Sequence, residues 1–162
     1  MRNKSNRQAH QELVLRHMAF TLFGTEGYKS SLPKFLDLAM IKLGELSREN
    51  LDELGDNFIE TIKIAYKIFG EDAFKRSLTD QQTNKVVNKP LFEAVSVSLA
   101  RLSPTARETL ITNKIEFRSG LKELLQNLKF IDAITLSTAN TESVLTRFEM
   151  VQNLVSEILI EK

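Results

Sequence analysis

Apolar residues recur at steps of three and four along almost the whole chain, and this spacing constrains the fold more than any other feature of the sequence. The pattern is clearest before Gly70, in a stripe made of Leu51, Leu54, Phe58, Ile59, Ile62, Ala65, Tyr66 and Phe69. Such a period places the side chains on one face of a helix. This stretch therefore predicts a long amphipathic helix, and the same spacing elsewhere predicts an all-α fold.

Further helices are expected on both sides of this one. Ser31 before Pro33, and Ser103 before Pro104, combine a capping side chain with a proline in the order typical of helix starts. The segment 130–135 is short and fits either a turn of helix or extended chain. The remaining expected helices are 8–23, 31–44, 90–102, 116–128 and one from Ser137 or Thr138 to the end. We expect one domain over residues 1–162, a bundle of about six to eight helices.

Three segments differ from this background. Small residues between the large apolar ones in the helix 90–102 permit close packing on several sides, so this helix is expected at the centre of the bundle. Residues 1–7 are polar and are expected to be flexible. Residues 77–88 lack an apolar period and predict a surface loop, the place where function or disorder is most expected.

Composition excludes several classes of protein. Apolar residues make up 42% of the 162, enough for a domain of this size to form a core. The absence of cysteine excludes disulfides and thiolate metal sites, and it fits a reducing compartment. No stretch approaches the roughly 18 uninterrupted apolar residues of a membrane span, and the basic N-terminus is followed by no signal-peptide core. We therefore expect a cytoplasmic protein without a membrane partner.

Charge is balanced overall but unevenly placed. The net charge is +1, from 22 basic and 21 acidic side chains, so the chain has no charge excess of the nucleic-acid-binding type. Acidic residues dominate 37–60, whereas the first helix and residues 101–122 are locally basic. Either a solvated mixed surface or a patch that faces phosphates explains this distribution.

No motif in the sequence specifies catalysis. His10 and His17 are seven residues apart, too far for the zinc-binding spacing of four, and no glycine-rich phosphate loop or nucleophile motif occurs. The acidic residues select no catalytic pair. We therefore expect no catalytic residue, no metal site, no cofactor and no enzymatic activity. An enzyme whose site is assembled from dispersed acids is a third hypothesis, which a deep polar pocket would support.

Several segments in order resemble the helical C-terminal region of the GmrSD-type family, the domain-of-unknown-function 262 proteins of modification-dependent restriction and phage defence. The segments are Gln11–Phe20, Tyr28 with Phe35-Leu36, Tyr66–Lys75, Asn88–Ala94, and Ser137-Thr138 to Arg147-Phe148-Glu149. Members usually begin with a ParB-like domain whose Asp-Gly-Gln-Gln-Arg motif is tied to nucleotide hydrolysis, and some end with a nuclease domain. Asp80-Gln81-Gln82-Thr83 lacks the glycine and arginine of that motif, so neither activity is carried over to this chain.

The resemblance implies a non-catalytic helical module that supports a DNA- or nucleotide-handling domain, detached here from its ParB-like half. Phosphate contacts are hypothesised for Arg7, Arg16 and Lys89. Leu15 and Phe20 fall off the main apolar stripe of the first helix, which indicates packing on two sides, and they are candidates for the face toward the missing domain or a second copy. The alternative hypothesis is a structural helical protein that forms a homodimer or docks a partner helix through its first and last helices.

Overall fold

The computed structural model describes residues 2–79 and 85–160, with only the backbone described for residues 2–5. The described chain forms eight α-helices and two short 3₁₀ helices, and it contains an isolated β-bridge but no strand. In chain order these are α1 (Arg2–Phe23), α2 (Leu32–Glu45), α3 (Arg48–Phe69), η1 (Gly70–Asp72), η2 (Arg76–Leu78), α4 (Lys89–Ala100), α5 (Pro104–Thr112), α6 (Lys114–Leu124), α7 (Leu128–Thr135) and α8 (Thr141–Ile160). The predicted all-α bundle is confirmed.

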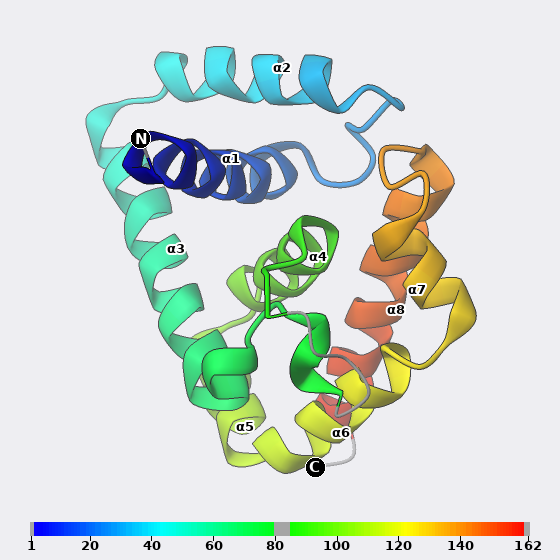
Figure 1. The fold of residues 1–162 in the computed structure, drawn as a ribbon. Coiled ribbons are helices and arrows are strands. Elements are labelled where there is room, and N and C mark those ends of the chain that lie inside the picture. Colours follow the sequence, from blue (N-terminus) through cyan, green and yellow to red (C-terminus); the bar gives the residue numbers. More distant parts are fainter. Residues whose placement is uncertain (1, 80–84, 161–162) are drawn as a thin grey trace.

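Helix α4 lies at the centre of the bundle, with α1, α3, α7 and α8 around it (Figure 1). Every side chain from Pro90 to Ala100 is buried, on all faces of the helix. Alternating small residues allow this, because alanine and serine let neighbouring helices approach while Leu91, Val95 and Leu99 fill the core. The central position expected from the sequence is confirmed.

Helix α1 lies between α4 and α2, so its C-terminal half packs on two sides (Figure 1). Phe20 is fully buried in an aromatic cluster, with ring centroids 4.8 Å from those of Phe35 and Phe148 and 5.8 Å from that of Tyr28. Burying a phenylalanine side chain contributes about 1.5–3 kcal/mol. The hypothesis that Phe20 faces a partner is therefore corrected, since α2 already covers it. Leu15 is half-buried and packs against the same core.

The other end of the molecule is formed by α3, α5, α6 and α8 (Figure 1). Phe69 and Phe117 join α3 to α6, with ring centroids 5.1 Å apart. Gly120 lets α6 approach α8 closely, because a Cβ atom there would lie 2.3 Å from Cδ1 of Leu154. The two helices meet along a shallow groove at this point.

Local capping decides the helix boundaries. The side chain of Ser103 accepts a hydrogen bond from the backbone N–H of Ala106, as its position before Pro104 predicts. Asn127 caps α7 by accepting from the N–H of Phe130 at 3.2 Å, so the helix expected to reach residue 128 ends earlier and residues 130–135 are helical. The last helix begins later than expected, at Thr141.

Two expectations about irregular segments need correction. Residues 2–7, expected to be flexible, are helical and form the start of α1. Within the expected loop 77–88, Leu78 and Thr79 are buried, since η2 turns Leu78 into the core. The return of this segment is fixed by a bridge from Lys75 to Val87, and residues 80–84 lie outside the described residues.

In the described part of the chain, no helix combines the length and the apolar character that crossing a membrane requires.

Candidate functional site

A network of charged side chains is buried where α1, α4 and α8 meet. At its centre is Glu93 of α4, whose side chain has no exposed surface. One carboxylate oxygen, Oε1, accepts hydrogen bonds from Nε of Arg147, at 2.9 Å, and from Nη2 of the same side chain. The other oxygen, Oε2, accepts from Nη1 of Arg16 at 3.1 Å. A single carboxylate thus joins guanidinium groups from the first and last helices.

Arg147 is held by backbone carbonyls as well as by the carboxylate. Its Nη1 donates to the carbonyl oxygen of Ala133 at 3.1 Å and to that of Thr138 at 2.8 Å. These carbonyls lie near the end of α7 and in the connection to α8. The guanidinium therefore fixes the α7–α8 turn to α4, and four of its N–H···O contacts are made inside the protein.

The network continues outward to the surface. Nε of Arg16 donates to Oε1 of Glu12 at 2.9 Å, and Nζ of Lys89 donates to Oε2 of Glu12 at 2.6 Å. The side chains of Lys89 and Glu12 are 40% and 34% exposed, whereas those of Glu93 and Arg147 are 0% and 2% exposed. The five groups carry three positive and two negative charges, and only the outer end meets solvent.

The ion pairs shift the pKa of Glu12. Burial would raise the pKa of this carboxyl, but hydrogen bonds from Lys89 and Arg16 and the positive charges of both outweigh burial, so the pKa is lowered. Glu12 therefore keeps its negative charge at a lower pH than an ordinary glutamate does. Its negative charge is what allows the two cations to lie side by side.

His17 adds a second buried contact between α1 and α4. Its Nδ1 lies 2.9 Å from Oγ of Ser96, and its ring meets Phe58 of α3 edge to face at 4.9 Å. Burial lowers the pKa of His17 to about 4, so the imidazole is neutral at physiological pH. The neutral side chain of His17 thus packs between α1, α3 and α4.

Tyr28 closes the same region from the α1–α2 connection. Its hydroxyl donates to the carbonyl oxygen of Ala139 at 2.6 Å. Burial raises the pKa of Tyr28; the nearby Arg147 and Arg16 act to lower it, and Glu93 acts to raise it. The hydroxyl thus stays protonated and donates to the α7–α8 turn, beside the carbonyls that Arg147 binds.

The three residues hypothesised to contact phosphates differ in their exposure and position. Arg7 is exposed on α1 and is nine residues, about 13 Å along the helix, from Arg16. Arg16 is buried, and its guanidinium faces Glu12 and Glu93 rather than solvent, which corrects its assignment to a phosphate-facing surface. Lys89 is at the accessible end of the network. Arg16 and Lys89 are therefore brought together, through Glu12, and Arg7 lies apart from them.

Glu93 and Arg147 are the central residues that sequence reasoning missed. A signal was present for Glu93, which is the one charged side chain between Pro90 and Ala100 in an otherwise apolar and small-residue helix. A charge in such a position requires a partner of opposite charge. Nothing in the sequence identifies Arg147 as that partner, because the two lie 54 residues apart.

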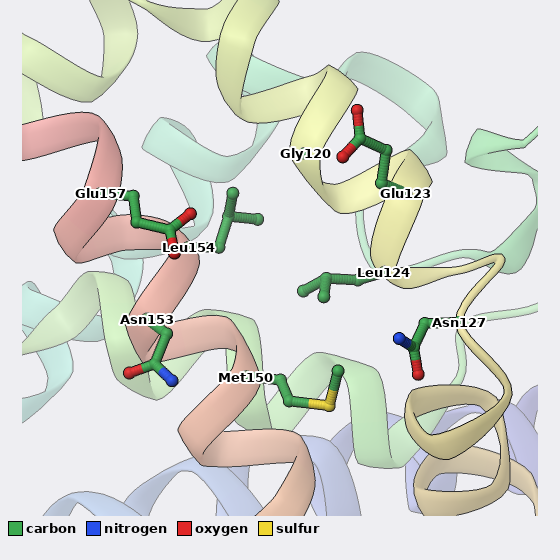
Figure 2. Close-up of a pocket in the computed structure, with 8 residues that line it drawn as sticks. All are labelled: Gly120, Glu123, Leu124, Asn127, Met150, Asn153, Leu154 and Glu157. Atoms are coloured by element: carbon green, nitrogen blue, oxygen red, sulfur yellow. The ribbon is translucent and has the colours of Figure 1, made fainter. Parts of the chain in front are cut away.

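Surface hollows lie outside the network, among them the following two. One, of about 310 Å³, runs between α6 and α8, where Leu124 and Met150 point into the groove and Glu123 and Glu157 stand at its edge (Figure 2). The other is an open hollow along α3 lined by Glu49, Asp52, Glu53, Asp56, Glu60 and Arg107, among others. Over the described residues, no group of three or more histidine and acidic side chains is arranged to hold a metal ion.

Comparison with models of protein families, with curated proteins and with solved structures finds no match to this chain. The role of the network is therefore inferred from its geometry. Its carboxylates and guanidinium groups face one another, and this arrangement clamps α1, α4, α8 and the turn before α8 in fixed relative positions.

Proposed function

We propose that this chain is a non-catalytic helical module that supports a DNA- or nucleotide-handling domain, as in GmrSD-like restriction and phage-defence proteins. The observation that supports the proposal most is the contrast between the two halves of α1. One half is clamped into the bundle by charged and aromatic contacts, whereas residues 6–11 of the other half are exposed. A helix that is anchored at one end and exposed at the other leaves its exposed end available to contact a second domain.

The clamped half begins at Glu12. From there to Phe20, side chains of α1 contact α4 through Glu12, Arg16 and His17, and Phe20 packs under α2. A buried charge network of this kind contributes more to the relative position of helices than to net stability, because desolvation offsets much of the ionic attraction. These contacts therefore fix the direction of α1 relative to α4 and α2.

The extended half includes residues 6–11, all of which are exposed. Six consecutive residues cover every face of a helix, so each side of this segment keeps exposed surface. A helical segment without tertiary packing is only marginally stable in water. Contact with another domain would stabilise it, which supports its role as the docking segment for a ParB-like domain or subunit.

Phosphate contacts form the second part of the proposal and are restricted to Arg7 and Lys89. Arg7 is exposed on the docking segment, and Lys89 is partly exposed at the surface end of the network. Each phosphate contact made by a cation makes the slope of log affinity against log salt more negative by about 0.9. Two contacts would give a slope of about −2.

Hydrogen exchange tests the docking segment. Amides of residues 6–11 in the free chain are expected to exchange rapidly, and addition of a ParB-like domain from a GmrSD-type protein in trans is expected to slow them. Amides of residues 150–158 in α8 serve as the internal control and should not change. Unchanged exchange at residues 6–11 in the presence of saturating partner domain would contradict the docking role.

Binding to a short DNA duplex tests the phosphate contacts. Fluorescence anisotropy between about 50 and 200 mM salt should give the slope expected for two contacts, and Arg7→Ala or Lys89→Ala should each reduce it by about 1. Lys129→Ala, at an exposed lysine of α7, is the matched control. Binding that is insensitive to salt, or equally reduced by the control, would remove this part of the proposal.

A further inference from the structure

Helix α2 forms the outermost layer of the bundle (Figure 1). Several of its large apolar side chains are exposed. Its inner face is anchored by the buried side chains of Phe35 and Ala39, which pack toward α1. Leu38, Met40 and Ile41 lie on the other sides of the helix and are 56%, 60% and 62% exposed. Leu38 and Ile41 are three residues apart and therefore adjacent on the helix surface, which makes them more than the scattered exposure that needs no explanation.

The outward residues of α2 follow the spacing of a helix-pairing seam. Lys34, Leu38, Ile41 and Glu45 are separated by steps of four, three and four, which align them in one stripe along the helix. All four are exposed. The stripe thus has an apolar centre, a positive charge at its N-terminal end and a negative charge at its C-terminal end.

This order of residues is complementary to itself. When two copies of the stripe run antiparallel about a twofold axis between residues 39 and 40, Leu38 faces Ile41 of the partner subunit, and Lys34 faces Glu45 of the partner subunit. A twofold axis repeats each contact, so two apolar pairs are flanked by two ion pairs. A stripe with like charges at its two ends would not match itself in this way.

We infer that α2 is the contact face of a symmetric homodimer in which two α2 helices pair antiparallel in this register. Gly44 lies beside the stripe, with no heavy atom within 4 Å of the position of a Cβ atom, so the two helices can approach closely there. Among the described residues, Glu45 makes a single ion pair, with Lys42 at 3.6 Å on the surface, and its side chain can turn to the partner's Lys34. The inference is independent of the proposed function, which concerns α1.

The small size of the interface limits its strength. A helix of 14 residues is about 21 Å long, and a pair of such helices buries less than the roughly 800 Å² per partner of a standard interface. The dimer is therefore weak, with dissociation in the micromolar range or above. Its formation depends on protein concentration rather than being constitutive.

Sedimentation velocity over a dilution series of the full chain tests the inference. We expect a reversible shift from monomer to dimer as concentration rises, and Ile41→Lys should weaken dimerisation at least tenfold, since it places two charges in the apolar centre. Ile115→Lys is the matched control, because Ile115 is another exposed isoleucine on a helix far from α2 in sequence. It should leave the dissociation constant unchanged.

A charge exchange tests the register. Lys34→Glu alone and Glu45→Lys alone each place like charges opposite one another and should weaken the dimer, whereas the double variant restores opposite charges and should recover the original affinity. Both single changes place the charge that the helix dipole favours at that end of α2, so neither is expected to unfold it. Circular dichroism confirms the fold of each variant.

Three results would overturn the inference. The first is a strict monomer up to the highest concentration that remains in solution. The second is a dimer that Ile41→Lys does not weaken, which would place the interface elsewhere. The third is a double charge exchange that fails to recover affinity, which would exclude the antiparallel register.

Discussion

Replacing Glu93 by glutamine is the most direct way to test whether the buried network holds the bundle together. The substitution keeps the size of the side chain but removes its charge. Arg147, which is 2% exposed, then loses its carboxylate partner and retains only backbone carbonyls. Arg16 retains Glu12 at the surface end. The variant therefore leaves one fully buried guanidinium without a counter-charge.

The expected loss follows from the burial of this charge. Removing one member of a buried ion pair costs about 3–5 kcal/mol, because the remaining charge stays desolvated. Domains of this kind have a total stability of about 5–15 kcal/mol, so the loss is a large fraction of the whole. For a chain of this length it corresponds to a fall in Tm of roughly 6–20 °C.

Urea denaturation followed by circular dichroism measures this loss. Glu157→Gln, at an exposed glutamate of α8, is the control and should change the free energy of unfolding by less than about 0.5 kcal/mol. A double-mutant cycle with Arg147→Met isolates the pair, and its coupling energy should exceed about 1 kcal/mol. If Glu93→Gln lowers the free energy of unfolding by less than about 1 kcal/mol, the reasoning is refuted. A buried guanidinium without a counter-charge should destabilise the fold by more than that.

Two further predictions concern His17 and Gly55. Unfolded His17 takes up a proton near its ordinary pKa of 6.5, whereas the folded side chain does so only near a pKa of about 4, so the unfolded state binds more protons between these values. As the pH falls from about 6.5 to 4.5, the free energy of unfolding should therefore fall by about 2–3 kcal/mol, and His17→Gln should remove that part of the pH dependence in urea denaturation. An unchanged pH profile in the variant would show that burial does not suppress its protonation. Gly55→Ala should raise the stability of α3 by about 0.5–1 kcal/mol in the same assay, because nothing lies within 4 Å of the new methyl group and alanine favours helix; a loss of stability would contradict this.

The helices themselves could be predicted because their signal is local. A stripe such as the one from Leu54 to Phe69 records burial on one face, and a proline after a capping serine, as at Ser103, marks the start of a helix. The central position of α4 could also be predicted, since small residues alternate with large ones only where several neighbours approach. These features depend on residues within one or two helical turns of each other.

The boundaries and the network could not be predicted, because they depend on competition and on distant contacts. Asn127 can extend one helix or cap the next, and the cap prevails through its bond to Phe130. The charge of Arg16 predicts a surface position, but its partner Glu93, 77 residues away in the sequence, holds it in the interior. No periodicity records which of several guanidinium groups folds against a buried carboxylate.

The position of Lys89 indicates which part of the proposed function contributes more, the docking of another domain or the phosphate contacts. A phosphate that binds Lys89 must compete with Glu12, whose carboxylate already lies 2.6 Å from Nζ. Part of the attraction to the phosphate is then offset by the lost ion pair, and repulsion from the charged Glu12 opposes it further. Arg7 has no such competitor among the described side chains, and it would contribute one contact of about 0.9 to the salt dependence, too little for stable binding to DNA on its own. Within the proposed function, packing of another domain on residues 6–11 therefore contributes more than phosphate contacts do.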